Sequence, residues 1–221
     1  MPRPSKPLIS RTAAVAAALE IIDTEGLEAF SVPRLAKHLG VQAPSLYYHF
    51  ADKAELMSAV ALHVIGDVSL PRRKPGPDWP EYFVTLGLNF RTGILRHRNA
   101  APILLQALPR TVLLRRYEEA AEFLAASGVP EELHVQILDG MERLSLGAVL
   151  TEAVRSPGSR ATIFPNVDPA SQPALARALA ANDRTSKRLY EEMIRSFLYG
   201  VVRDAELPAA QPTAQGRRLT S

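Results

Sequence analysis

The chain contains no cysteine among its 221 residues. This absence excludes disulfides, thiolate metal sites and cysteine nucleophiles, and it is typical of a reducing compartment. Charged residues interrupt every apolar run before it reaches the roughly 18 residues of a membrane-spanning helix. The first ten residues lack the apolar core of a secretory signal peptide. We therefore expect a soluble, cytoplasmic protein that is long enough to form a full hydrophobic core.

The chain also lacks a strong excess of either charge, since its formal net charge is only +3. The positive charge is uneven, however, because Arg3, Lys6 and Arg11 occur near the N-terminus with no acidic residue among them. Such a basic arm either remains a solvated tail or lies along DNA phosphates.

Catalytic motifs are missing from the sequence. It has no glycine-rich phosphate loop, no GxSxG elbow and no HExxH helix. The histidines are scattered without metal-ligand spacing: His38, His49, His63, His97 and His134. We predict no metal, no cofactor and no enzymatic activity, with an all-α enzyme whose site is assembled in space as the alternative.

The most informative stretch is SVPRLAKHLGVQAPSLYYHFADK, residues 31–53. Ser31 can N-cap a first helix, and Gly40 can end it because glycine tolerates a positive φ. Pro44 fits the first turn of a second helix over residues 43–50. Two short helices joined by a tight turn are typical of a helix-turn-helix, whose second helix enters the major groove of DNA.

The predicted second helix has two unlike faces. Leu46 and Phe50 are four residues apart and can anchor one face in a core. The other face carries polar and aromatic side chains: Gln42, Ser45, Tyr47, Tyr48 and His49. This set is either a half-buried aromatic turn or a surface that contacts DNA.

The rest of the chain reads as helices, so the predicted fold class is all-α. We expect helices over residues 10–24, 52–66, 78 onward, 100–107, 111–127, 130–155, 174–181 and 184–206. Asp78 and Glu81 have the spacing of a capping box at the start of the helix that begins near residue 78. Residues 67–77 contain three prolines and a basic triplet and form the best candidate for a domain boundary.

Residues from Ser10 to about Gly66 resemble the N-terminal domain of the TetR family of transcriptional repressors. The matching positions are Gly26, Leu35–Ala36, Leu39–Gly40–Val41, Ser45–Leu46–Tyr47, His49–Phe50, Lys53 and Leu56. Pro33 departs from the pattern, because relatives often carry arginine there. A looser resemblance to the tetracycline-repressor-like branch covers much of residues 95–180, through LRHRNAAPILL, FLAASGVPEELHVQILDGMERLSLGAVLTEA and DPASQPALARAL.

The resemblance implies a three-helix DNA-binding domain with a helix-turn-helix, followed by a larger helical domain for ligand binding and dimerisation. We predict a flexible basic arm (1–9), the DNA-binding domain (10–66), a linker (67–77), the ligand-binding and dimerisation domain (78–207) and a disordered tail (208–221). The predicted function is a homodimeric repressor that binds a palindromic double-stranded DNA operator and is released by an unknown small-molecule effector. A helical protein-interaction module is the alternative.

Specific roles follow for residues of the helix-turn-helix. Phosphate contacts are predicted for Ser31, Arg34, Ser45, Tyr47 and Lys53. Base contacts are predicted for Gln42 and Tyr48, with Ala43 against a thymine methyl group. His49 either packs or touches a phosphate.

Candidate pocket residues in the C-terminal domain share an apolar or aromatic character and helical spacing, apart from one histidine. They are Phe83, Leu86, Phe90, His97, Leu104, Leu105, Met141 and Leu144. For each of them, packing in the core is the alternative that the sequence favours. His97 resembles the magnesium-coordinating histidine of tetracycline repressors, but one histidine cannot hold Mg²⁺, which prefers oxygen ligands. We therefore predict no tetracycline and no metal, and His97 either bonds an organic ligand or caps a helix end.

Two helices have the features of a dimer interface. Gly140 and Gly147 are seven residues apart on one side of a long helix and allow close approach of another helix. The last helix carries a ridge of large apolar groups, Leu189, Met193, Phe197 and Val201. In the resembled family two such helices from each subunit form a four-helix bundle; packing within one chain is the alternative.

Overall fold

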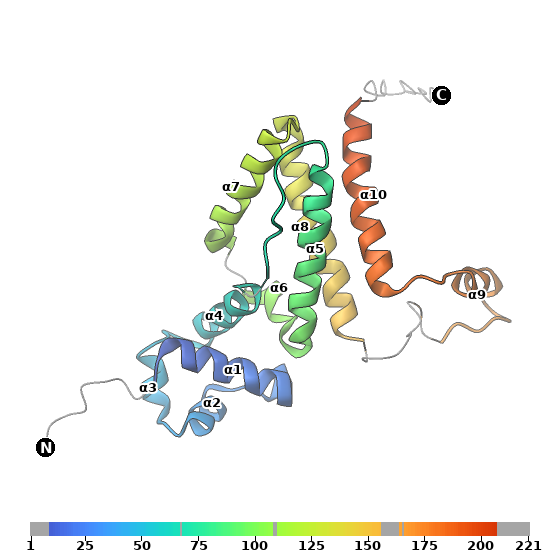
Figure 1. Ribbon diagram of the computed structural model, residues 1–221. Helices are drawn as coiled ribbons and strands as arrows, with labels where there is room; N and C mark the ends of the chain where they lie inside the picture. Colours follow the sequence, from blue (N-terminus) through green and yellow to red (C-terminus); the bar gives the residue numbers. More distant parts are fainter. Residues whose placement is uncertain (1–8, 67, 108–109, 156–163, 165, 207–221) are drawn as a thin grey trace, which may run out of the picture.

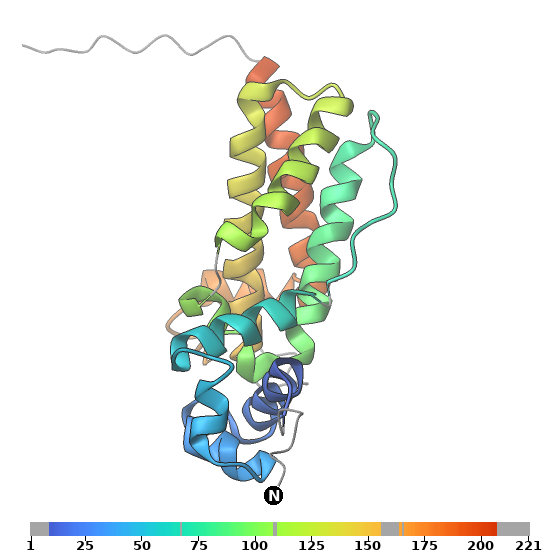
Figure 2. The ribbon, with the colours of Figure 1, turned by 90° about the vertical axis from the view of Figure 1, so that its left-hand side faces the viewer.

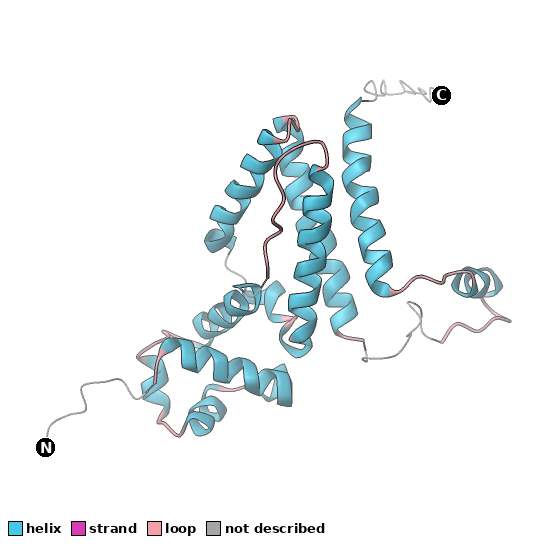
Figure 3. Cartoon of the chain, viewed as in Figure 1, coloured by secondary structure: helices cyan, strands magenta, loops and turns pink. Residues whose placement is uncertain are grey.

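The computed structural model describes residues 9–66, 68–107, 110–155, 164 and 166–206. These residues form ten α-helices and two short 3-10 helices, with no strand among them, as Figure 3 shows. The all-α prediction is therefore confirmed. Residues 1–8 of the predicted arm and the predicted tail lie outside the described residues. Among the helices that the structure describes, none combines the length and hydropathy needed to span a bilayer.

The N-terminal helices form the part of the molecule that we call the head. It contains α1 (Arg11–Glu25), η1 (Leu27–Ala29), α2 (Val32–Leu39), α3 (Ala43–Tyr47) and α4 (Lys53–Gly66). Ser31 caps α2 by accepting a hydrogen bond from the Arg34 amide at 3.2 Å. Gly40 ends this helix in the left-handed conformation, with φ of 66°. Both ends of α2 therefore form as the sequence predicts.

Helix α3 is shorter than predicted, because it ends at Tyr47 rather than near Phe50. The backbone tightens there, since the His49 amide donates to the Leu46 carbonyl at 2.9 Å. This turn brings the chain back toward the core, where Phe50 is only 3% exposed.

The C-terminal helices form the part that we call the body. It contains α5 (Trp79–Arg96), η2 (Arg98–Ala100), α6 (Ile103–Ala107), α7 (Arg110–Ala126), α8 (Glu131–Ala153), α9 (Pro173–Ala180) and α10 (Ser186–Glu206). The helix predicted over residues 100–107 splits into η2 and α6, with Pro102 between them. The capping box predicted at residue 78 does not form, because Asp78 makes no side-chain cap and Glu81 binds Arg195 instead.

The head lies at one end of the molecule, and α4 connects it to the lower end of the body (Figures 1 and 2). Helices α5, α8 and α10 run alongside one another, while α9 stands apart from them. A Cβ atom at Gly140 would lie 2.1 Å from Cζ of Phe197, so glycine is what lets α10 approach α8 this closely. The close approach predicted for Gly140 is therefore made within the chain.

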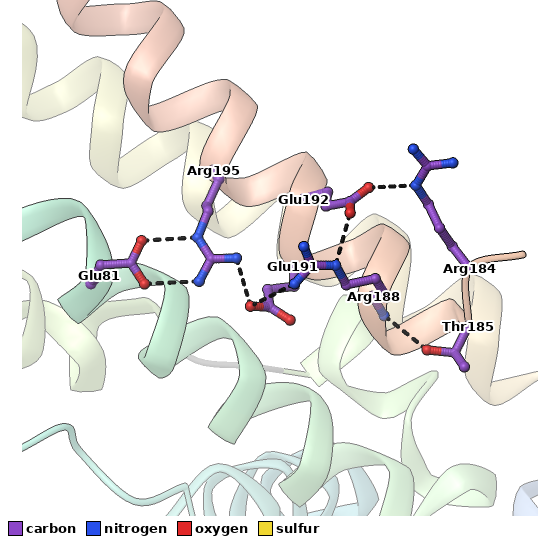
Figure 4. A network of polar contacts seen from close by, with 7 residues as sticks. All are labelled: Glu81, Arg184, Thr185, Arg188, Glu191, Glu192 and Arg195. Carbon is purple, nitrogen blue, oxygen red and sulfur yellow. Dashed lines mark hydrogen bonds and ion pairs between the residues drawn. The ribbon is translucent and has the colours of Figure 1, made fainter.

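Charged side chains also attach α10 to α5 (Figure 4). Arg195 binds the Glu81 carboxylate through two N–H groups, each 2.9 Å from a carboxylate oxygen. This guanidinium lowers the pKa of the Glu81 carboxyl group. Glu192 of α10 binds Arg188 of the same helix and Arg184, which precedes the helix. Helix α10 is thus held by apolar packing against α8 and by the ion pair of Arg195 with Glu81 of α5.

Candidate DNA interface and effector cavity

The outer face of α3 is the most exposed aromatic surface of the head. Tyr48 is 81% exposed and Tyr47 is 53% exposed, whereas Leu46 on the opposite face is 2% exposed. Gln42 is also exposed, and Ala43 and Ser45 are half-buried beside it. The predicted anchoring face is confirmed, and Gln42, Tyr47 and Tyr48 are exposed as predicted. Ser45 and His49, predicted for the same exposed face, are half-buried. Exposed tyrosines on a helix held this firmly can meet phosphates and base edges without rearranging the core.

Arg34 is less available than the sequence suggests. Its Nε donates to Oε2 of Glu25 at 3.1 Å, and a second N–H group binds the other carboxylate oxygen. Hydrogen bonding to this guanidinium lowers the pKa of the Glu25 carboxyl group. A DNA phosphate would have to replace that carboxylate to bind Arg34.

Lys53 begins α4 and has an exposed side chain. Its ammonium group lies 5.7 Å from the centroid of the Phe30 ring, which is buried in the head. An aromatic face attracts a cation without satisfying its hydrogen-bonding capacity. Lys53 can therefore bind a phosphate while its stem remains positioned.

His49 holds the end of α3 against the start of α1. Its Nε2 lies 3.0 Å from the carbonyl oxygen of Ile9, and its own carbonyl accepts a hydrogen bond from Arg11. Arg11 also forms an ion pair with Glu55 at 2.8 Å and lies 4.4 Å above the Phe50 ring. No local sequence pattern indicates this role of Arg11, whose position near the N-terminus suggests only a charge of the basic arm.

A cavity of about 180 Å³ lies between α5, α7 and α8 in the body. Four of the predicted residues line it: Phe83, Leu86, Phe90 and Met141. Further walls come from residues that sequence reasoning missed, including Tyr82, Leu113, Arg116, Tyr117, Leu138 and Ser145. Val68 and Leu70 add a wall from the segment between α4 and α5. Hydrogen bonds hold this segment near both ends: Asn89 donates to the Ser69 carbonyl, and the Gly76 amide donates to the Ser127 hydroxyl.

The other four predicted residues do not line this cavity, which corrects the sequence prediction. Leu104 is 3% exposed in α6, the helix that packs against α4, and Leu105 on the next position is 68% exposed. Leu144 is half-buried on α8 but is not part of the cavity wall. His97 caps the end of α5 and bonds Asp23 of α1, with Nδ1 and Oδ2 2.6 Å apart. Helical spacing alone does not indicate which side of an apolar helix meets a cavity and which meets another helix.

Polar groups enter the cavity wall at a few defined points. The buried Tyr190 hydroxyl lies 2.9 Å from Oγ of Ser145 and 3.3 Å from the Gly87 carbonyl oxygen. Burial raises the pKa of the Tyr190 phenol to about 12. Tyr117 donates to the Glu142 carboxylate, and the Tyr82 ring stacks on Phe123 with centroids 4.1 Å apart. An apolar and aromatic lining with a few polar groups is typical of small-molecule sites.

Metal ligation has no support in the described part of the chain. No group of three or more His, Asp or Glu side chains there has the geometry to hold a metal ion. His97 has one carboxylate neighbour, Asp23, and that pair joins the head to the body.

Comparisons with known proteins match both halves of the chain. Residues 14–60 match the family "Bacterial regulatory proteins, tetR family", and residues 70–201 match "Tetracyclin repressor-like, C-terminal domain". The class D tetracycline repressor protein of Escherichia coli is 27% identical over 147 residues, which span 65% of this chain and 66% of that protein. The class E protein of Escherichia coli is 25% identical over 207 residues, 92% of this chain and 96% of that protein.

Solved structures show the same architecture. A possible TetR family transcriptional regulator from Streptomyces coelicolor A3(2) is 27% identical, with a TM-score of 0.75 over 89% of this chain and all of that one. ActR from Streptomyces coelicolor, in complex with actinorhodin, is 26% identical, with a TM-score of 0.73 over 90% of this chain and 99% of that one. The chain belongs to the tetR family of bacterial regulatory proteins and is a DNA-binding transcriptional regulator with a small-molecule effector domain.

Proposed function

We propose that the chain is a homodimeric repressor that binds a palindromic operator through α3 and leaves it when a small molecule fills the cavity. The observation that carries this proposal is the pair of exposed tyrosines at the C-terminal end of a firmly anchored α3, Tyr47 in its last turn and Tyr48 at its C-cap. In this proposal residues 10–66 are the DNA-binding domain and residues 78–207 the ligand-binding and dimerisation domain. The protein acts in the cytoplasm, where operator DNA is available.

On DNA, we assign phosphate contacts to Tyr47, Ser45 and Lys53. Gln42 and Tyr48 read base edges, and Ala43 meets a thymine methyl group. Arg34 reaches a phosphate only by leaving Glu25, so its contribution is smaller than that of Lys53. Ser31 acts through its cap on α2, and His49 holds α3 in place.

The proposed effector is a mostly apolar molecule that contains aromatic rings. Phe83, Leu86, Phe90 and Met141 would pack against it, and the polar points near Ser145 and Tyr117 would orient it. The solved structures of ActR with actinorhodin and of an Acinetobacter baumannii TetR variant with minocycline support a cavity of this class. Release follows because the effector prefers one of two arrangements of the recognition helices.

The proposed dimer interface lies on the outer faces of α8 and α10. Val201 packs into its own chain, and Phe197 covers Gly140. Met193 and Tyr199 remain 39% and 52% exposed on α10, and Gly147 is exposed on α8. A second copy would cover these groups and place two recognition helices on a two-fold axis, as a palindrome requires.

Selection from fragmented genomic DNA, followed by footprinting of the enriched fragments, tests the proposal. We expect a protected palindrome that disappears when Tyr47 and Lys53 are both replaced by alanine. The control variant replaces Phe164 and Lys187, an exposed aromatic and an exposed lysine outside the head. Absence of enrichment at low salt, where phosphate contacts are strongest, would favour a protein-interaction module instead.

A further inference from the structure

The tripeptide His97–Arg98–Asn99 lies where the head meets the body. Nδ1 of His97 is 2.6 Å from Oδ2 of Asp23, and Nδ2 of Asn99 donates to the Asp23 carbonyl at 2.9 Å. Asp23 belongs to the last turn of α1, the helix that supports α2 in the head. Two side chains of the tripeptide therefore hold the head at a place separate from α4.

Arg98, the middle residue of the tripeptide, binds the C-terminal end of α8 instead of α1. Its Nη2 donates to the carbonyl oxygens of Glu152 at 2.5 Å and Arg155 at 2.8 Å. The last carbonyl groups of an α-helix have no partner within the helix, and a cation is favourable beside them. The Glu152 side chain is held in turn by Arg91 of α5, with Nε and Oε2 2.8 Å apart. The C-terminal end of α8 is thus fastened to α5 and to the tripeptide.

Both helices that meet at this point are walls of the cavity. Phe90 lines it from α5, and Ser145 and Leu146 line it from α8. Helix α5 continues directly into the tripeptide, whereas the end of α8 is attached to it through Arg98. A change in the distance between the two walls must therefore act on the tripeptide from two sides.

The carboxylate of Asp23 has a single side-chain partner among the described residues, His97. Its Oδ1 is buried and accepts no hydrogen bond from any described residue, so the carboxylate depends on His97 for its side-chain partner. The Asp23 side chain is only 28% exposed, so loss of the His97 contact would leave a partly buried carboxylate without a described side-chain partner, which is destabilising. A contact of this kind can be present in one arrangement of head and body and absent from another, and such a difference can carry coupling between distant sites.

We infer that His97, Arg98 and Asn99 are positioning residues that transmit movement of α8 to α1, and hence to the helix-turn-helix. His97 then acts by holding the head and not by binding the effector. The inference rests on the proposed function, since it needs a cavity that fills and a head that binds DNA. The hydrogen bonds that couple α8 to α1 join residues of this chain alone. The inference therefore also predicts that α8 and α1 are coupled in the protein without DNA or effector.

Hydrogen–deuterium exchange of the full chain without DNA tests that prediction. In Arg98→Ala we expect amides in the last turn of α8 to exchange faster, and amides in the last turn of α1 to exchange at least about threefold faster as well. Both hydrogen bonds of Arg98 go to the end of α8, so a purely local role would leave α1 unchanged. The control is Arg96→Ala, which removes an exposed arginine at the end of α5. Unchanged α1 exchange in Arg98→Ala would overturn the inference.

A second arm uses the operator duplex obtained by selection. Its binding should slow exchange at the end of α8 in the wild-type protein, because coupling between two sites is reciprocal. At equal DNA occupancy, Arg98→Ala should lose this protection, and Arg98→Lys should regain part of it because an ammonium group can still bind a carbonyl. Protection that persists in Arg98→Ala contradicts the inference. If the wild-type protein binds no duplex, the proposed function fails, while the exchange rates of the free protein still decide whether α8 and α1 are coupled.

Discussion

The head and the body carry their functional residues in different ways. In the head, the exposed residues from Gln42 to Lys53 occupy one short stretch of sequence, and their neighbours Leu46 and Phe50 are buried. In the body, the cavity walls come from α5, α7 and α8, which are separated along the chain. A DNA-reading surface departs visibly from an ordinary amphipathic helix. A cavity wall does not, because it uses the same residues as a core.

The two regions also differ in how they can be disturbed. A change on the outer face of α3 alters a surface and leaves the packing of the head intact. A change between α5, α8 and α10 alters helices that touch closely enough for a single methyl group to matter. Stability measurements should therefore respond to the body, and sequence-selective binding to the head.

The largest effect is expected at Gly140. Alanine there would place its Cβ within 3 Å of three carbon atoms of the Phe197 ring, at 2.1, 2.8 and 2.9 Å. Overpacking of this kind is destabilising, and we expect a loss of about 3 kcal/mol in the free energy of unfolding. Gly66→Ala is the control, because Gly66 is exposed at the end of α4, outside the proposed dimer interface, and nothing lies within 4 Å of its Cβ position. Thermal unfolding should show Gly140→Ala melting lower than wild type and Gly66→Ala melting no lower. Equal melting temperatures would mean that α10 does not pack on α8 as described.

A smaller and more selective effect is expected at Gln42. Gln42→Ala should relax base preference at one position in each half-site by about 2 kcal/mol, while unfolding stays unchanged. Tyr47→Phe provides the contrast, because loss of a phosphate contact weakens binding to all sequences about equally. Selection profiles of both variants measure this difference. A profile for Gln42→Ala identical to that of wild type would remove this residue from the base-reading set.

The smallest effect is expected at Tyr190, behind the cavity wall. Tyr190→Phe removes hydrogen bonds to Ser145 and Gly87 and should cost about 1 kcal/mol of stability at neutral pH. The phenol ionises near its usual pKa of 10.0 in the unfolded chain, whereas burial raises the pKa to about 12 in the folded protein. Its contribution is therefore complete below pH 10 and is lost as the pH rises toward 12.

Denaturant unfolding between about pH 9 and 12 measures this dependence. The wild-type protein should lose more stability over that range than Tyr190→Phe does. Tyr48→Phe is the control, since Tyr48 is 81% exposed and lies outside the proposed dimer interface. Identical slopes for wild type and Tyr190→Phe would show that the Tyr190 hydroxyl is not buried in solution.

Interactions between neighbouring residues explain what could be predicted. The cap by Ser31, the left-handed Gly40 and the buried Leu46 depend on residues a few positions away, and all three formed as expected. The pairs Arg34–Glu25 and His97–Asp23 join residues that no local spacing relates. The first makes Arg34 less available than expected, and for His97 the structure bears out the helix-cap alternative. In the cavity, Phe83 and Met141 could be anticipated as apolar residues on helices, but Tyr82 and Tyr117 could not.

Local sequence features are enough to predict that the chain is helical and that residues 31–53 form a helix-turn-helix, because caps, turns and apolar periodicity act over a few residues. The choice of which apolar residues face the cavity and which pack between helices is made by the tertiary structure, because the distance between two helices depends on residues far apart in the chain. The tertiary structure also decided the role of His97. That side chain meets Asp23 only when α1 and the end of α5 are brought together.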